Sequence, residues 1–70
     1  MRYYSTHRPV APGTFPKPDG NKVIEIVNFD KRQYCREAGR DCWGYIEYEH
    51  PLSEKQAVDY ELVREQLLDF

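Results

Sequence analysis

The chain has 70 residues, of which 40% are hydrophobic, 14% aromatic and 31% charged, and its formal net charge is −2 at pH 7. This composition is typical of a small globular domain and excludes an intrinsically disordered chain. No apolar run approaches the roughly 20 residues of a membrane-spanning helix, and residues 1–7 lack the apolar stretch of a secretory signal, so we expect a cytoplasmic protein with no membrane partner.

Residues 1–21 contain four of the five prolines. Proline fixes φ and lacks a backbone N–H, so this stretch cannot form a long helix or a central strand. We expect a short edge strand over residues 3–6, an extended arm after a turn at residues 11–16, and a turn at residues 19–21. The arm has apolar side chains to bury and should lie across the domain; they are Tyr3, Tyr4, Val10 and Phe15.

Residues 22–29 are dense in β-branched side chains and predict a strand. Both of its faces are apolar, which is typical of a central strand that is covered on both sides. After this strand, Asp30 and Gln33 have the spacing of a capping box, and Gly39 lies where a glycine ends many helices. The sequence therefore predicts a short helix over residues 31–38.

Residues 42–49 predict a second strand, in which Gly44 marks a bulge or a close approach by an aromatic ring. Ser53 and Gln56 form another capping box, which predicts a final helix over residues 54–67. Its main apolar face consists of Ala57, Tyr60, Val63, Leu67 and Leu68, with Phe70 beyond them. Val58 and Leu62 fall on the opposite side, so either this helix ends early or a second stripe contacts another surface.

These elements predict an α+β fold in one domain over residues 1–70. We expect a small sheet of two to three strands, two helices and the Pro-rich arm of residues 1–21 packed on the compact core of residues 22–70. The connection between the two main strands has about a dozen residues, which is close to the lower limit for a parallel crossover, so antiparallel pairing is favoured.

Charge is distributed unevenly along the chain. Residues 1–40 carry eight Lys/Arg and four Asp/Glu, whereas residues 41–70 carry two and eight. This asymmetry fits an interaction surface, or two parts of the fold that pack together and neutralise each other. We favour the second interpretation because surface charge is usually solvated.

The two cysteines and two histidines do not have the spacing of a zinc site. Cys35 and Cys42 are seven positions apart, and His7 and His50 lie far from each other in the sequence, whereas structural sites use close pairs. We therefore predict reduced, buried thiols and no metal or cofactor.

Catalysis is not indicated either. The chain lacks local signatures of nucleophilic catalysis, and Glu47 and Glu49 fit a solvated strand end. A chain this short also has little room to enclose a pocket of several hundred Å³. We predict no enzymatic activity, no catalytic residue and no small-molecule substrate.

The remaining function class is a non-enzymatic protein-interaction module, which binds a protein partner or forms a homodimer. Aromatic residues and the second helical stripe are the candidates for its interface; these are Trp43, Tyr45, Val58 and Leu62. The alternative is weak nucleic-acid binding by a basic patch on the helix near residues 31–40, although the net charge of −2 gives an unfavourable overall field. That patch consists of Lys31, Arg32, Arg36 and Arg40.

Several stretches of the chain are similar to a known family. They are Tyr4–Lys17, Val27–Asp30, Gly39–Asp41, Trp43–Ile46 and Tyr48–Ser53, within a likeness that spans residues 3 to about 62. The chain resembles an uncharacterised family of small bacterial proteins and domains from gut-dwelling Firmicutes, often associated with mobile genetic elements. The resemblance implies no established activity, cofactor or catalytic residue, and its link to mobile elements is one of association.

Overall fold

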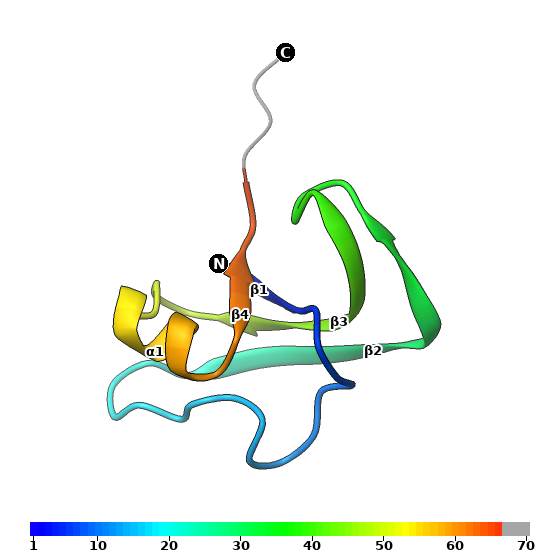
Figure 1. Cartoon of the computed structure of the whole chain (residues 1–70). Helices are drawn as coiled ribbons and strands as arrows, with labels where there is room; N and C mark the ends of the chain where they lie inside the picture. The colour runs from blue at the N-terminus through cyan, green and yellow to red at the C-terminus, as the bar shows by residue number, and fades with distance from the viewer. Residues whose placement is uncertain (67–70) are drawn as a thin grey trace.

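A computed structural model describes residues 1–66 of the chain. Its elements are β1 (Arg2–Ser5), β2 (Val23–Cys35), β3 (Arg40–Tyr48), α1 (Glu54–Asp59) and β4 (Leu62–Arg64). The strands form one four-stranded sheet in the order β2-β3-β1-β4, and each neighbouring pair is antiparallel (Figure 1). The predicted antiparallel pairing is confirmed, but the α+β class with two helices is wrong, because the fold is mostly β with one short helix among the described residues.

The helix predicted over residues 31–38 is part of a hairpin. Strand β2 continues to its end, where Gln33, Tyr34 and Cys35 pair with Cys42, Asp41 and Arg40 of β3. Gly39 has a φ of 68° and closes the hairpin turn, where its N–H donates to the Cys35 carbonyl at 2.9 Å. The capping-box spacing is a local signal, whereas the pairing of residues 33–35 with β3 continues a strand that already begins at Val23.

The last helix begins where the sequence predicts and ends early. Ser53 Oγ accepts from the Gln56 N–H, and Gln56 Oε1 accepts from the Ser53 N–H, both at 3.1 Å. Helix α1 ends at Asp59, and Glu61 has a φ of 55°, which is incompatible with continued right-handed helix. The chain then forms β4, so the alternative of an early end is correct. Leu67, Leu68 and Phe70 lie outside the described residues.

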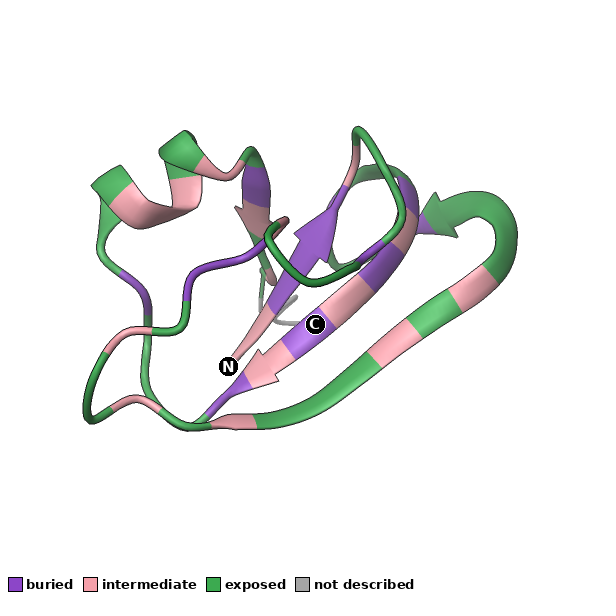
Figure 2. Cartoon of the chain, turned by 90° about the horizontal axis from the view of Figure 1, so that it is seen from below, coloured by how far each residue is buried: buried purple, intermediate pink, exposed green. Residues whose placement is uncertain are grey.

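Two strands occupy positions opposite to those predicted. Strand β1 was expected at an edge but lies between β3 and β4, and its Tyr3, Tyr4 and Ser5 are buried. Strand β2 was expected at the centre but forms an edge, and most of its residues are exposed (Figure 2). The N-terminal strand takes the central place because its adjacent tyrosines supply large apolar groups to both faces of the sheet.

The core consists of two clusters on opposite faces of the sheet. The first cluster contains Tyr3, Val10, Phe15, Ile46, Tyr48, Leu52 and Leu62. The second contains Tyr4, Cys35, Ala38 and Cys42, with Phe29, Tyr45 and Val63 packed against it. In Figure 1 the arm runs below β2 and α1 lies at the left beside the start of β4, while the tip of the β2–β3 hairpin rises above the other strands. Consecutive residues of a strand, such as Tyr3 and Tyr4, therefore pack in different clusters.

The Pro-rich arm packs across the sheet as predicted, and two asparagine side chains hold it. The Asn28 amide accepts from the Val10 N–H and donates to the Val10 carbonyl, both at 2.8 Å. The Asn21 amide makes the same pair of bonds with the backbone of His50, again at 2.8 Å. Each amide thus makes the pair of hydrogen bonds that a residue of a neighbouring strand would make. These bonds fix the arm without adding a strand to the sheet.

The uneven charge of the sequence is neutralised within the fold. Arg2 pairs with Glu47 at 3.3 Å and Arg8 with Glu61 at 2.9 Å, so basic residues early in the chain meet acidic residues from its last part. These two pairs agree with the interpretation that the two parts pack side by side, while the basic residues of the hairpin stay exposed.

Candidate functional site

The outer edge of β2 is the longer of the two edges of the sheet, the other being that of the three-residue β4. Strand β2 pairs with β3 on one side only, so every second residue directs its backbone N–H and C=O away from the sheet. Among residues 1–66, no other strand pairs with that side. An edge of this kind is a template on which another extended chain can form hydrogen bonds.

The two halves of β2 differ in how well they are protected. Charged residues commonly blunt sheet edges, and the second half carries Asp30, Lys31 and Arg32, whereas a register shift occurs in each half. The first half has Glu25 as its one charged side chain, between Ile24 and Ile26, which are 59% and 45% exposed. We call residues 23–28 the open edge.

A pocket lies directly beside the open edge. A register shift between Val23 and Glu25 places Val23 opposite Tyr48 and Ile26 opposite Ile46, so both side chains share the face of the first cluster. With the arm they border an open pocket of about 470 Å³, a groove on the surface and not the enclosed cavity that the sequence argues against. The arm residues that line this arm pocket are Val10, Ala11, Pro12, Phe15, Lys17 and Asn21.

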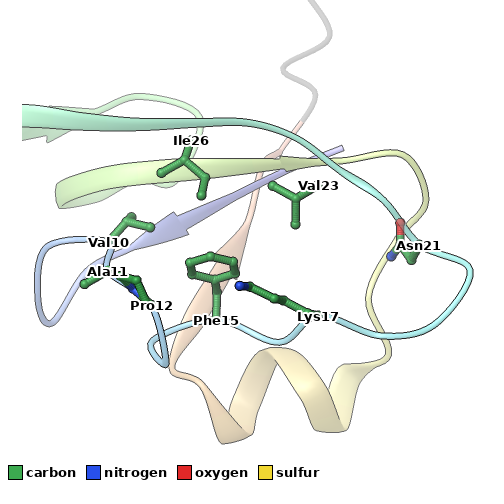
Figure 3. A pocket seen from close by; sticks show the side chains of 8 residues that line it. All are labelled: Val10, Ala11, Pro12, Phe15, Lys17, Asn21, Val23 and Ile26. Carbon is green, nitrogen blue, oxygen red and sulfur yellow. The ribbon is translucent and has the colours of Figure 1, made fainter.

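The arm pocket is apolar with a single charged side chain. Figure 3 shows Val23 and Ile26 pointing from β2 toward Phe15 and Lys17 of the arm. Lys17 Nζ lies 5.7 Å from the centroid of the Phe15 ring, within the range of a cation–π contact. Lys17 therefore places a positive charge at the wall of an otherwise uncharged pocket.

The four residues predicted for a protein interface lie in different parts of the fold. Val58 is 73% exposed on α1, whereas Leu62 is buried in the first cluster. Trp43 is half-buried on β3. Tyr45 packs against the second cluster, with its ring 5.5 Å from that of Tyr4. The sequence reasoning missed Ile24, Ile26 and Lys17 as surface residues of interest.

The four basic residues of the alternative site do come together, although no helix carries them. Lys31 and Arg32 lie near the end of β2, Arg36 lies in the turn and Arg40 begins β3, and all are exposed. Tyr34, which is 65% exposed, lies among them. Arg32 Nε is 3.6 Å from Asp41 Oδ2, so acidic neighbours on the same hairpin reduce the positive potential.

Comparison with known proteins adds the family. The model of the family described as Defence against restriction A C-terminal matches residues 1–66. The chain belongs to this family. The description agrees with the predicted link to mobile elements, because anti-restriction is a function of phages and such elements, and it gives no specific activity. No curated protein and no solved structure matches the chain.

In this family member the potentially reactive side chains are buried or dispersed. Burial raises the pKa of the Cys35 thiol, and burial together with its contact to Cys35 raises the pKa of Cys42 to about 12, so both are protonated and weakly nucleophilic at neutral pH. His7 lies 3.3 Å from Glu61, and His50 lies 3.4 Å from Glu49.

The described residues contain neither a cluster of metal ligands nor a membrane-spanning helix. Within residues 1–66, no three His, Cys, Asp or Glu side chains gather in a way that could hold a metal ion. In the same part of the chain, no helix has the length and apolar character to cross a membrane.

Proposed function

We propose that this Defence against restriction A C-terminal domain is a non-enzymatic protein-interaction module that binds its partner through the open edge of β2. The observation that carries the proposal is an unpaired strand edge with exposed Ile24 and Ile26 beside an apolar pocket. Exposed apolar edges favour association with another chain, since both main-chain bonds and apolar area become available to it.

The distribution of reactive groups supports an interaction role rather than catalysis. The thiols lie in the second cluster, on the face of the sheet opposite the arm pocket. Lys17 is the one titratable side chain that lines the pocket. A pocket with one cation and apolar walls can hold a side chain, but it does not supply the acid–base pair that most hydrolytic or transfer reactions use.

Site-specific photocrosslinking tests the proposal. A photoreactive phenylalanine analogue replaces Ile24 in the open edge or, as a control, Val58 on α1, which is even more exposed. The proposal predicts a discrete crosslinked protein at position 24 and none at position 58, and loss of binding of that purified protein to the Ile24→Lys variant. Equal labelling at both positions, or binding that Ile24→Lys leaves unchanged, would contradict it.

Nucleic-acid binding through the hairpin tip is the second candidate function. The observation in its favour is that the β2–β3 hairpin carries four exposed basic residues and the exposed Tyr34 within one short stretch of the fold; the basic residues are Lys31, Arg32, Arg36 and Arg40. Binding to mixed oligonucleotides should then fall steeply with salt and weaken in Arg32→Gln and Arg36→Gln. Absence of binding at low salt would eliminate this candidate.

A further inference from the structure

We infer that the open edge and the arm pocket form one groove for an extended, acidic and apolar segment of a partner protein. The segment adds a strand to β2, places an apolar side chain in the arm pocket and sets a carboxylate beside Lys17. This inference rests on the proposed function and specifies the chemistry of the partner.

The backbone of the open edge determines the conformation of the occupant. Main-chain donors and acceptors in a row are satisfied by an extended chain lying about 4.8 Å from β2. Side chains of an added strand alternate between the two faces, so every second one lies over the face that carries Val23 and Ile26. That face is continuous with the arm pocket (Figure 3).

The arm pocket determines the side chain that enters. Its volume of about 470 Å³ accommodates a large apolar group such as leucine or phenylalanine. Phe15, Val10 and Ile26 provide the apolar walls, so burial of such a group removes hydrophobic surface from water on both molecules. A polar side chain would lose its hydration there without regaining enough hydrogen bonds.

Charge determines the flanking residue. Lys17 is the one charged side chain among those that line the pocket, and a carboxylate near its ammonium group gains a partly desolvated ion pair. Glu25 does not oppose this carboxylate, because Glu25 pairs with Glu47 in the register of the sheet and so lies on the other face. The occupant therefore carries Asp or Glu on the pocket side.

A second copy of this chain fits the groove less well. Two-fold pairing of the open edges would bring Glu25 of one chain close to Glu25 of the other, and like charges on neighbouring strands are destabilising. The charged second half of β2 rises away with the hairpin tip (Figure 1), which leaves a short contact. A partner of different sequence avoids both difficulties.

A random library of nine-residue peptides displayed on phage, with the purified chain as bait, tests the inference. We expect enriched peptides that combine strand-forming residues, one large apolar residue and an Asp or Glu next to it. Synthetic versions should lose binding when a proline is placed at the centre, since proline removes a main-chain donor. They should bind the Lys17→Glu variant at least about fivefold more weakly, an effect that shrinks with salt.

Matched variants keep the test specific. Lys55→Glu, on the exposed surface of α1, reverses the same charge away from the groove and should leave the affinity unchanged, and thermal unfolding of each variant verifies that it folds. Peptides that show no acidic preference, or that bind Lys17→Glu normally, would overturn the inference while the proposed function stands. A dimer whose formation requires Ile24 would also overturn it, since a second copy would then fill the edge.

If no peptide is enriched from the library, two explanations are possible, and the crosslinking experiment distinguishes them. If position 24 still captures a folded partner, the groove does not bind an extended segment and the inference is wrong, although the domain is an interaction module. If position 24 captures nothing, the proposed function fails as well.

Discussion

Asn28 connects the arm to the sheet, and Gly44 makes this connection possible. A Cβ atom at Gly44 would lie 2.2 Å from the Val27 carbonyl oxygen and 3.1 Å from Asn28 Oδ1. The sequence predicts a bulge or a close aromatic ring at this glycine; a close approach is indeed found, but the neighbour is the main chain of β2. Because Gly44 has no side chain, the Asn28 amide can pass over it to reach Val10.

Replacement of Gly44 by alanine should destabilise the protein by about 3 kcal/mol, because backbone of the paired strand cannot move without loss of sheet hydrogen bonds. Urea unfolding measures the change. Gly39→Ala is the control: its Cβ meets no atom within 4 Å, and only its positive φ opposes the change, at about 1 kcal/mol. Similar losses in both variants would show that crowding at Gly44 is unimportant.

Asn28→Asp should loosen the arm at one point. The carboxylate can still accept from the Val10 N–H but cannot donate to the Val10 carbonyl, so we expect a loss of about 1–2 kcal/mol. Hydrogen exchange should accelerate at the Val10 amide, while the His50 amide, which bonds to Asn21, keeps its protection. Acceleration of both amides to the same extent would mean that the arm opens only as a whole.

At the level of elements, the sequence predicts three of the four described strands, a helix over residues 31–38 that does not form, and a final helix that begins correctly but is too long. Strand signals work where β-branched and aromatic residues are dense, as in residues 22–29 and 42–49. The signal at Asp30 and Gln33 fails because a capping box takes account of four residues only, whereas the pairing partner of that segment lies on β3. The final helix is overestimated because no Gly or Pro marks the turn at Glu61.

One observation in the sequence does indicate the true end of α1. Leu62 falls on the side of the expected helix opposite to its main apolar face. In the structure Leu62 packs in the first cluster and Val63 against the second, because neighbouring side chains of a strand point to opposite faces. The exposed edge could not be predicted in the same way. The sequence predicts a helix over residues 31–38 that would cover β2. Because this helix does not form, Ile24 and Ile26 lie at the surface.

The turn between α1 and β4 should make stability depend on acid pH. The hydrogen bond from Arg8, together with the nearby His7, lowers the pKa of Glu61. A lowered folded-state pKa gives stability that is present above the unfolded value of about 4.3 and is lost as pH falls through the folded value. Glu61→Gln should therefore be less stable than the parent at pH 7 and equally stable near pH 3.

Thermal unfolding of parent and Glu61→Gln from pH 7 to pH 3 measures this difference. Comparison with the parent is needed because Glu47, whose pKa is lowered by the N-terminal ammonium group and by Arg2, titrates in the same range in both proteins. A difference between the two proteins that is constant over the whole pH range would show that Glu61 does not act through its charge.

At the level of the whole molecule, the sheet bends until its two ends meet. The Gln66 N–H donates to the Glu37 carbonyl at 2.8 Å, which joins the segment after β4 to the turn of the β2–β3 hairpin. The second cluster is enclosed by this contact. The arm pocket likewise exists only because distant segments meet, so sequence reasoning could predict the burial of Val10 and Phe15 but not the pocket between them and β2.

The buried thiols should report on this closure. Because Cys35 and Cys42 are buried with raised pKa values, alkylation by iodoacetamide at pH 8 should be slow in the native protein and should accelerate in parallel with unfolding in urea. Gly44→Ala should increase the rate for both thiols. Rapid alkylation of the stable native protein would show instead that the hairpin tip opens independently.

The asparagine bridges that hold the arm have a consequence for the kinetics of the proposed partner binding. Since side-chain amides, and not a fifth strand, fasten the proline-rich segment, its own backbone never competes for the vacant side of β2. A guest can dock without first expelling a resident strand, so association should proceed in one kinetic phase whose rate rises linearly with guest concentration. A second, slower phase would show that part of the arm must first leave the edge of β2.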